Sequence, residues 1–238
     1  MYTEQPVIRV KELFKIYRLG EERVRALNGV DFYINKGEFC SIVGTSGSGK
    51  STLLNMLAGL EQPTKGEIII AGEHLENKTE NQLVEFRRMH IGFVFQSYNL
   101  MPSLTAIENV ALPLSFQGVD RVTRNKRAEQ LLDLVGLDRY KKHRPTQMSG
   151  GQQQRVGMAR ALVVEPEIVF ADEPTGNLDS VTSEEMMHLM REVVRGKKQT
   201  LVMVTHDNHL ASYADKIINI QDGKILSISC QDISCQNK

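Results

Sequence analysis

Apolar runs rich in β-branched residues alternate along the chain with segments whose apolar residues recur at helical spacing. Ile168–Ala171 and Leu201–Val204 are continuously apolar, which is typical of strands buried on both faces of a parallel sheet. Phe39–Val43 is a short apolar run that leads directly into a glycine-rich segment. The apolar residues of Lys50–Leu60 then follow a helical period. This alternation predicts an α/β fold, with a mostly parallel sheet covered by helices.

The strand pattern fades between residues 97 and 164, where helical spacing replaces it. The segments with this spacing are Thr105–Leu112, Arg124–Val135 and Gln152–Val164. Pro102, Pro113 and Pro145 punctuate the region and predict breaks between its elements. We therefore expect a helical subdomain of about residues 97–164, inserted into the α/β core.

Two patterns near the carboxyl terminus concern packing only. A single apolar stripe between residues 183 and 195 predicts a helix that packs on the core. The stripe consists of Met186, Leu189, Met190, Val193 and Val194. The chain ends in a polar tail, about residues 227–238, and we expect this tail to be frayed because polar terminal segments are seldom tied down.

The composition is that of an ordinary globular protein, with 41% hydrophobic and 24% charged residues. A length of 238 residues suffices for one large α/β domain, with or without an inserted subdomain, but not for two full domains. The 29 basic and 29 acidic residues cancel, and tryptophan is absent. Neither a basic footprint nor a stacking platform therefore suggests a nucleic-acid partner.

Membrane, secretion and zinc signals are also missing from the sequence. No apolar run approaches the length of about 20 residues that spans a bilayer, and the amino terminus lacks the basic flank and apolar stretch of a secretion signal. The cysteines, Cys40, Cys230 and Cys235, are odd in number, and the histidines are scattered. We expect reduced thiols in a cytosolic protein and no structural zinc.

The residues that follow the first apolar run match the pattern G-x-x-x-x-G-K-[ST], a phosphate-binding loop. They are Gly44, Thr45, Ser46, Gly47, Ser48, Gly49, Lys50 and Ser51. Glycines let backbone N–H groups converge on phosphate oxygens, and the positive end of the next helix points to the same place. We expect Lys50 to reach the β- and γ-phosphates and the Ser51 hydroxyl to bind Mg²⁺.

A chance glycine-rich turn is the alternative interpretation of this loop. Ordinary residue frequencies give such a match in about one of a hundred chains of this length, and the strand and helix on either side make chance rarer still. GTPases, small-molecule kinases, helicases and transport ATPases all carry the loop. It therefore predicts nucleotide binding without deciding among these classes.

Two further segments are more specific. The sequence Met148-Ser149-Gly150-Gly151-Gln152 resembles the signature of ABC (ATP-binding cassette) proteins, with Met148 in the place of the usual leucine. Ile168–Glu173 resembles the Walker B strand of the same family, four apolar residues followed by two acids. The resemblance extends from about Val7 to Ile225. It implies a single nucleotide-binding domain over residues 1–238, with a RecA-like parallel core, an antiparallel β subdomain and an inserted helical subdomain.

The resemblance also implies roles for individual residues. Tyr17 matches the aromatic residue that stacks on adenine, and Gln96 matches the Q-loop glutamine that contacts the metal and the attacking water. Glu173 is implied as the catalytic base, and His206 as the switch histidine that contacts the γ-phosphate. Asp179 matches the D-loop aspartate at the dimer interface. Each has a plain alternative, because a lone tyrosine is often packing and a lone histidine is often a surface residue.

The same resemblance implies the ligands and the assembly. Mg²⁺ would be bound by Ser51, Gln96 and Asp172. ATP would be bound by the loop from Gly44 to Ser51 together with Tyr17, Thr52, Ser149, Gly150, Gly151, Gln152 and Asp179. In the family each ATP lies between the phosphate loop of one subunit and the signature of its partner. This chain has one of each, so a working unit would need a second copy of itself.

Residues 95–102 and 141–147 resemble the subgroup that serves lipoprotein release, macrolide export and antimicrobial-peptide resistance. The resemblance implies an ATPase at the cytoplasmic face of the membrane that drives a separate transmembrane permease. A relay of mechanical signals to a cell-division or envelope complex, without transport, is the alternative within this subgroup. A soluble ABC ATPase acting on DNA or the ribosome would need long coiled coils or two cassettes per chain, and a P-loop kinase would leave the signature unexplained.

The membrane partner is expected to dock directly after Gln96. Tyr98, Leu100, Met101 and Leu104 are apolar residues in a segment that also contains polar Ser97 and Asn99 and ends in proline. A short helix of a partner fits such a groove, and the γ-phosphate sensor lies only a few residues away. The alternative is that these residues only pack the helical subdomain together.

Overall fold

The computed structural model describes residues 6–20 and 22–231, which form two compact units. The first unit combines Met1–Arg87 with Val194–Lys238, and the second is Arg88–Val193. Two helices, α2 (Glu80–His90) and α6 (Ser180–Gly196), each have residues in both units. The units are described one at a time below.

The first unit contains an antiparallel sheet with the strand order β2-β1-β4-β5. The strands are β1 (Ile8–Leu19), β2 (Glu22–Ile34), β4 (Lys65–Ile70) and β5 (Glu73–His74). Buried and exposed residues alternate along the second half of β2, as expected of a sheet with one covered face. A short 3₁₀ helix, Leu75–Asn77, follows β5 and leads towards α2.

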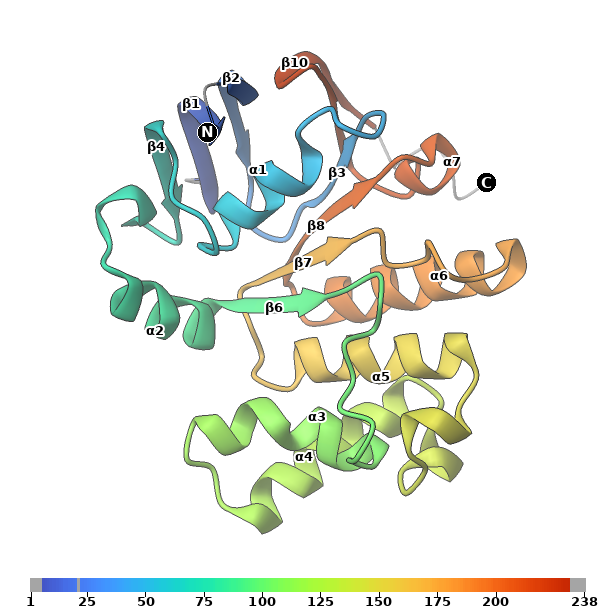
Figure 1. Ribbon diagram of the computed structural model, residues 1–238. Helices are drawn as coiled ribbons and strands as arrows, with labels where there is room; N and C mark the ends of the chain where they lie inside the picture. Colours follow the sequence, from blue (N-terminus) through green and yellow to red (C-terminus); the bar gives the residue numbers. More distant parts are fainter. Residues whose placement is uncertain (1–5, 21, 232–238) are drawn as a thin grey trace, which may run out of the picture. The chain divides into compact units, whose positions relative to one another are not determined.

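The same unit contains a second group of strands, in which β3 lies between β8 and β9 and is parallel to both. The elements are β3 (Phe39–Val43), α1 (Lys50–Leu57), β8 (Thr200–Thr205), α7 (Asn208–Ala211), β9 (Lys216–Gln221) and β10 (Lys224–Cys230). Figure 1 shows β3 and β8 as neighbouring strands. Every residue of both is buried, which confirms the prediction that Leu201–Val204 is a strand covered on both faces.

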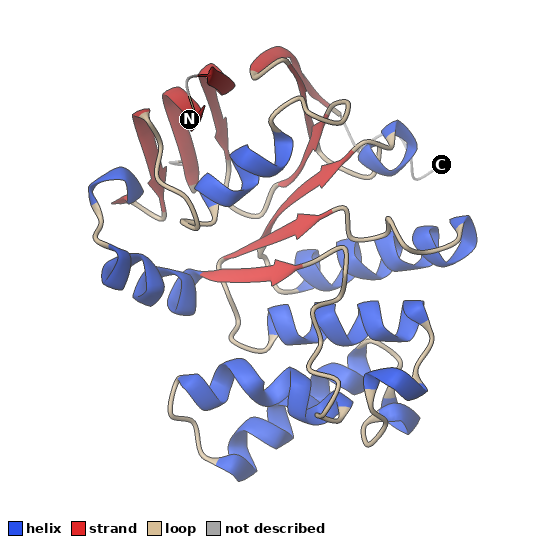
Figure 2. Ribbon diagram, in the orientation of Figure 1, coloured by secondary structure: helices blue, strands red, loops and turns tan. Residues whose placement is uncertain are grey.

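The second unit pairs two parallel strands with a group of helices (Figure 2). Its elements are β6 (Ile91–Val94), α3 (Ala106–Phe116), α4 (Arg121–Leu134), α5 (Gly150–Leu162), β7 (Ile168–Asp172) and most of α6, with short 3₁₀ helices at Asp138–Tyr140 and Pro145–Gln147. Helix α3 packs against α4 and α5, and α5 packs against β6. Side chains fix the starts of these helices, since Thr105 forms a capping box with Glu108 and Asp120 caps α4.

Two expectations about helices were wrong in detail. Pro113 does not end a helix but lies inside α3, where the amide of Gln117 still bonds to the carbonyl of Pro113 at 3.3 Å and closes the last turn. A proline near a helix end removes one bond without preventing another turn. On α6 the buried face includes Met187, whereas Leu189 is only half-buried. The buried positions run from Ser183 through Met190 at spacings of three and four residues, and this period leaves residue 189 off the face.

The polar tail was also wrong in part, because residues 227–230 belong to β10 and pair antiparallel with β9. Most side chains of β10 are exposed. Backbone hydrogen bonds to β9 hold this edge strand, and Asn219 Nδ2 also donates to the Ser227 hydroxyl at 2.9 Å, so exposed side chains do not prevent the pairing. The rest of the tail, including Cys235, lies outside the described residues.

The described helices include none that is long and apolar enough to cross a membrane. Over residues 6–20 and 22–231, no group of three or more His, Cys, Asp or Glu side chains is arranged to hold a metal ion. Cys40 is a free thiol inside the first unit, and its burial raises its pKa far above the ordinary value. It therefore remains protonated and behaves as a small apolar side chain.

Asn109 is a fully buried polar residue of α3, with 0% of its surface exposed. Its Oδ1 accepts from the amide of Met101 at 2.8 Å, and its Nδ2 lies 3.1 Å from the Met101 carbonyl. The carbonyls of Leu104 and Thr105 lie 3.2 and 3.0 Å from the same nitrogen. One side chain therefore fastens the loop that precedes α3.

Replacing Asn109 by leucine keeps the branching and the number of side-chain heavy atoms but leaves these loop groups without a partner. We expect Asn109→Leu to lower the free energy of unfolding by about 2–3 kcal/mol, since unpaired buried polar groups bear their full desolvation cost. Urea denaturation followed by circular dichroism measures the change. Val122→Ala, at an exposed position of α4, is the control and should shift stability by less than about 0.5 kcal/mol. Equal effects of the two substitutions would contradict this assignment.

Candidate functional site

The predicted phosphate-binding loop leaves β3 at the edge where β8 also ends. Val43 is in register with Thr205, so Gly44 and His206 follow the ends of two neighbouring parallel strands. Loops at the carboxyl edge of a parallel sheet form the usual ligand crevice of α/β proteins. The structure therefore places His206, which is exposed, beside the start of the loop.

Two glycines of the loop lie where a side chain has no room. A Cβ at Gly44 would collide with the carbonyl of Ile220 and lie 2.6 Å from the Ser48 hydroxyl. A Cβ at Gly49 would collide with the carbonyl of Ala26. Gly49 also has a φ of 101°, in the left-handed region, and is the N-cap of α1. Only glycine satisfies both demands, so the main chain itself lines this cradle.

The polar groups of the loop suit a polyphosphate. The Lys50 ammonium is buried and donates to the carbonyls of Gly44 and Thr45, both at 2.8 Å. The Ser48 hydroxyl is also buried, and it has no hydrogen-bond partner within the described residues. Ser51 is exposed in the first turn of α1. Three features of this loop suit a phosphate chain. Its main chain has no room for Cβ atoms, it leads into a helix N-terminus, and its lysine is already held across it.

His206 is held in a loop that the structure fixes from both sides. The amide of Asp207 donates to the Thr205 hydroxyl at 3.0 Å. The Asp207 carboxylate then caps α7, accepting from the amides of His209 at 2.7 Å and Leu210 at 3.3 Å. Asp207 therefore sets the path of the chain on the far side of His206.

Tyr17 lies near the end of β1, and its hydroxyl donates to the Glu61 carboxylate at 2.6 Å. Burial, and next the bond to Glu61, raise the pKa of Tyr17, while a hydrogen bond with the Thr52 side chain lowers it. Thr52 directly follows the phosphate-binding loop. The structure therefore brings Tyr17 to the first turn of α1, in the same unit as the cradle and His206.

In the second unit, Gln96 and the two acids follow neighbouring strands. Val94 of β6 is in register with Ala171 of β7, so the chain reaches Gln96 and Asp172 at the same edge of this parallel pair. Glu173 has a φ of 41°, a left-handed conformation that is uncommon for any residue except glycine. Strained backbone of this kind clusters at functional sites because surrounding structure holds a side chain in one direction.

Gln96 is held by the segment after Glu173. Its carbonyl accepts from Asn177 Nδ2 at 2.9 Å. A Cβ at Gly176 would lie 2.7 Å from Gln96 Nε2, so the glutamine side chain packs directly on this glycine. Asp179 accepts from the amide and hydroxyl of Thr182 at 3.0 and 2.7 Å. These bonds, led by the one from the Thr182 amide, lower the pKa of Asp179 and keep it ionised as the cap of α6.

The signature-like segment forms the N-terminus of α5. Ser149 is the N-cap, and it exchanges hydrogen bonds with Gln152 in a capping box at 2.9 and 3.3 Å. A Cβ at Gly150 would lie 2.8 Å from the Tyr98 hydroxyl, and one at Gly151 would lie 2.7 Å from the Thr182 methyl group. Close packing against Tyr98 and Thr182 therefore requires glycine at both positions. Because glycine has no side chain, the backbone amides at the positive end of α5 stay accessible.

Sequence reasoning missed two residues that hold this region together, Asn177 and Arg160. Arg160 of α5 donates to the carbonyls of Tyr98, at 2.8 Å, and of Asn99. Both accepting residues have positive φ, 59° and 48°. Burial lowers the pKa of Arg160 from its ordinary value. A basic residue inside the otherwise apolar run Met158–Leu162 was the one available signal, and it indicates a buried charge without naming its partner.

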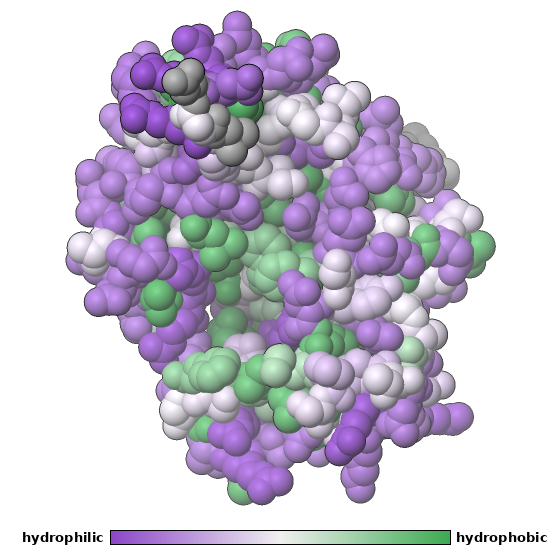
Figure 3. All heavy atoms as spheres, viewed as in Figure 1, coloured by the Kyte–Doolittle hydropathy of each residue, from purple (hydrophilic) through white to green (hydrophobic). Residues whose placement is uncertain are grey.

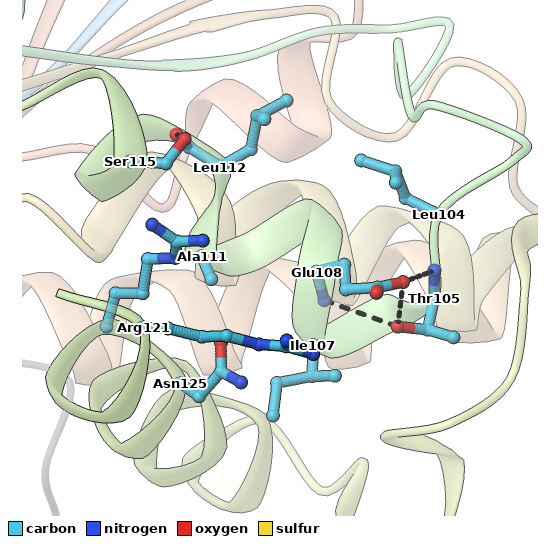
Figure 4. A pocket seen from close by; sticks show the side chains of 10 residues that line it. Leu104, Thr105, Ile107, Glu108, Ala111, Leu112, Ser115, Arg121 and Asn125 are labelled. Carbon is cyan, nitrogen blue, oxygen red and sulfur yellow. Dashed lines mark hydrogen bonds between the residues drawn. The ribbon is translucent and has the colours of Figure 1, made fainter. Parts of the chain in front are cut away.

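A cavity of about 350 Å³ lies between α3 and α4 in the second unit. Its walls include apolar Leu104, Ile107 and Leu112 and charged Glu108, Arg121 and Arg124. Glu108 points back to Thr105, from whose amide and hydroxyl it accepts at 2.8 and 2.7 Å (Figure 4). The Glu108 carboxylate is therefore held in the helix cap but keeps its charge, so two arginines and one glutamate leave the lining with one net positive charge.

The surface around α3 also carries apolar side chains, seen in green in Figure 3. Large apolar residues that are exposed in the second unit include Met101 and Phe116. Of the residues expected to form a docking groove, Leu104 lines the cavity and Leu100 is half-buried. Tyr98 instead packs its hydroxyl against Gly150. The packing alternative therefore holds for Tyr98, whereas Met101 is open to a partner.

The sequence-predicted site residues thus form two groups, one in each unit. Residues 44–52, Tyr17 and His206 meet around the start of α1 in the first unit. The second unit contains the acids at the end of β7, together with Gln96, Asp179 and the capped start of α5.

Comparisons with known proteins agree with these features. The family model described as "ABC transporter" matches residues 27–176. An uncharacterized ABC transporter ATP-binding protein of Thermotoga maritima is 50% identical over 93% of this chain and 94% of its own length. The macrolide export ATP-binding/permease protein MacB of Shewanella sp. (strain ANA-3) is 45% identical over 94% of this chain, which spans only 34% of that protein.

A solved structure gives the same result for the fold. The ATP-binding cassette MJ0796, described as dimeric in a post-hydrolysis state with ADP and Pi, superposes with a TM-score of 0.86 at 44% identity. The match covers 94% of this chain and 98% of that one. The relative of this name comes from Methanocaldococcus jannaschii. The α/β fold with a parallel and an antiparallel sheet is therefore that of the ABC ATP-binding domain.

The contact between Gly176 and Gln96 is open to a direct test. In Gly176→Ala the new methyl group displaces the Gln96 amide, and we expect the rate of ATP hydrolysis to fall by about tenfold or more, since small misplacements of a reacting group are costly. The melting temperature should change little. Gly196→Ala is the matched control, because its Cβ meets nothing within 4 Å. Normal turnover in Gly176→Ala would show that Gln96 need not lie on this glycine.

Proposed function

Because the chain belongs to the ABC transporter family, we propose that it is the ATP-binding and ATP-hydrolysing subunit of a membrane transporter complex. The observation that carries this proposal is the cradle at the start of α1. Its main chain excludes Cβ atoms at Gly44 and Gly49, and its lysine lies across the loop. The family supplies the reaction, which converts ATP and water to ADP and phosphate.

We assign the phosphate contacts to the residues of the first unit. Backbone amides of residues 44–51 would bind the β- and γ-phosphate oxygens, and Lys50 would leave its loop carbonyls to neutralise the same oxygens. Ser48 has a buried hydroxyl that lacks a partner and suits one more phosphate contact. His206, at the neighbouring strand end, would contact the γ-phosphate. These contacts position the phosphate chain and reduce its charge, which is most of what phosphoryl transfer requires.

Hydrolysis also needs a metal and a base. Ser51, Gln96 and Asp172 offer hydroxyl, amide and carboxylate oxygens, a donor set that suits Mg²⁺, which keeps several waters. When bound, Mg²⁺ neutralises charge on the β- and γ-phosphate oxygens. Glu173 would accept a proton from water as the water oxygen bonds to the γ-phosphorus. The bond from this phosphorus to the bridging oxygen breaks, and ADP takes its electron pair.

The chain has one phosphate loop and one signature, and we propose that two copies close around two ATP molecules. The N-terminus of α5 would face the γ-phosphate bound by the other copy. Ser149 already orients its hydroxyl through the capping box, and Gly150 and Gly151 leave the adjacent amides accessible. The dimeric state described for the cassette MJ0796 supports this arrangement.

We further propose that the subunit sits at the cytoplasmic face of the membrane and drives a transmembrane permease on a separate chain. The MacB relatives are macrolide export proteins with a permease part, and this chain spans about a third of their length. Export of a lipoprotein, peptide or drug is the corresponding role for the complex.

The cavity between α3 and α4, with Met101 beside it in sequence, is the surface we assign to the permease. Apolar walls and two arginines suit a short amphipathic segment that carries an acidic side chain. The side chain of Asn109 is hydrogen-bonded to the main chain of Met101, so a partner that binds this loop would meet a segment that α3 holds in place. The loop begins directly after Gln96, which places the surface close in sequence to the nucleotide contacts.

Glu173→Gln tests the catalytic assignment. The substitution keeps the side-chain volume but removes the carboxylate, so we expect turnover to fall about a thousandfold, a typical contribution of a general base. ATP binding should persist, and the trapped species should be a dimer with two ATP molecules. Analytical ultracentrifugation and nucleotide quantification measure both properties. Hydrolysis at a near-normal rate would exclude Glu173 as the base.

The control for the dimer adds Ser149→Arg to the Glu173→Gln chain. An arginine in this place fills the space that the other copy's γ-phosphate needs, so the double variant should bind ATP as a monomer. A dimer that still forms with ATP would contradict the composite site.

Charge at the docking surface tests the permease contact. Met101 has 49% of its surface exposed, and Met101→Asp should leave the fold and basal ATPase within about twofold of normal, since exposed substitutions perturb stability little. Assembly with the co-expressed permease, and stimulation by it, should be lost. Leu134→Asp, at a residue 50% exposed in the last turn of α4, is the control and should assemble normally. Normal assembly of Met101→Asp would place the contact elsewhere.

A further inference from the structure

A polar cluster in the first unit joins the end of β1 to the segment that follows α1. Glu61 is its centre, and it accepts from the Tyr17 hydroxyl at 2.6 Å and from Asn55 Nδ2 at 3.2 Å. Asn55 belongs to α1, whose first residues continue the phosphate-binding loop. The carboxylate therefore ties the tyrosine to the helix that carries the cradle.

Lys15 completes the cluster from the same strand as Tyr17. Its ammonium lies 3.3 Å from Glu61 and donates to the carbonyl of Gln62 at 2.7 Å. The same nitrogen lies over the Tyr17 ring, 5.1 Å from its centroid. A cation held over one face of an aromatic ring is attracted by the ring quadrupole and occupies that face. A base that stacks on Tyr17 would therefore have to use the opposite face.

The cluster is partly shielded from water, which makes its bonds firmer than a surface ion pair. The side chains of Lys15 and Glu61 have 16% and 29% of their surface exposed. Burial alone would raise the pKa of Glu61, but hydrogen bonds from Tyr17, Asn55 and Lys15 outweigh it and lower the pKa below its ordinary value. Glu61 is therefore ionised at neutral pH, and Tyr17, whose pKa is raised, keeps its proton as the donor.

We propose that Glu61 is a positioning residue for nucleotide recognition, which acts by holding the hydroxyl of Tyr17 so that one ring face is presented to adenine. Lys15 assists by covering the other face. This inference rests on the proposed ATPase function and on the stacking role of Tyr17. An unheld tyrosine on a strand end would lose rotamer freedom each time a base bound, and the bond to Glu61 removes that cost beforehand.

The experiment compares Tyr17→Phe and Glu61→Ala with the normal chain in ATP hydrolysis. Each substitution keeps the aromatic ring at position 17 but removes the hydrogen bond to Glu61 that holds it. We expect KM for ATP to rise by about threefold to tenfold, a part of the stacking energy measured for bases on aromatic side chains, with kcat changed by less than about twofold. Tyr17→Phe/Glu61→Ala should raise KM by less than the product of the two single effects, because both substitutions remove the bond between Tyr17 and Glu61. Glu61→Gln, which still accepts a hydrogen bond, should restore part of the loss.

Tripolyphosphate, which has no base, separates this role from damage to the cradle. Its inhibition constant should be the same in all variants, because it contacts only the phosphate loop. Glu80→Ala removes a different carboxylate, paired with Arg87 at 2.9 Å, and should leave KM unchanged. If Glu61→Ala folds poorly, Tyr17→Phe carries the test by itself, since it removes a single oxygen.

The outcomes distinguish the inference from the function on which it rests. A wild-type protein that neither hydrolyses ATP nor binds tripolyphosphate would refute the ATPase proposal itself. An active normal chain whose KM is unchanged in Tyr17→Phe and Glu61→Ala would overturn the role of Glu61. A double variant with additive effects, or an equal loss of tripolyphosphate binding, would overturn it as well, because the residues would then act separately or through the cradle.

Discussion

The close approach of main chain to main chain is the constraint on which the rest of the first unit depends. A loop whose backbone amides are to bind phosphate must lie close to the sheet beneath it, which leaves no space for side chains on that side. At Gly44 and Gly49 the loop lies against the carbonyls of Ile220 and Ala26, with no space for a Cβ. Ile220 belongs to β9 and Ala26 to β2, so these two strands must be placed first, and the all-buried β3 lies beside β9. The proposed phosphate contacts therefore depend on the sheet as well as on the loop.

In the second unit, the same side chains that would meet a ligand or partner also finish the local fold. Ser149 caps α5, and Asp179 caps α6. Each residue is thereby oriented at no further entropic cost when a partner arrives, since the cap has already restricted its rotamers. The arrangement also means that a substitution there weakens a helix start as well as a contact. Loss of activity at such positions has to be separated from loss of structure.

The sequence alone was enough to predict the buried strands β3, β7 and β8 and the phosphate-loop motif, for identifiable reasons. Strands buried on both faces have unbroken apolar runs, and the loop has a chemistry that only a few residue types allow. The strand β10 was missed because backbone bonds to β9 hold it despite its polar side chains. The contact between Tyr17 and Glu61 joins residues 44 positions apart, and no motif or period encodes such a meeting. The bond from Arg160 to Tyr98 was beyond prediction for the same reason.

That bond from Arg160 bears on how this protein can be recombined with its relatives. The loop after Gln96 adopts left-handed turns at residues 98 and 99, and a guanidinium on α5 holds the carbonyls of both. Gly150 on the same helix leaves room for the hydroxyl of Tyr98. The loop and α5 therefore depend on each other for their structure, although more than fifty positions separate them in the sequence. A chimera that borrows the corresponding loop of another protein would have to import the matching α5 with it, or else lose the loop's shape.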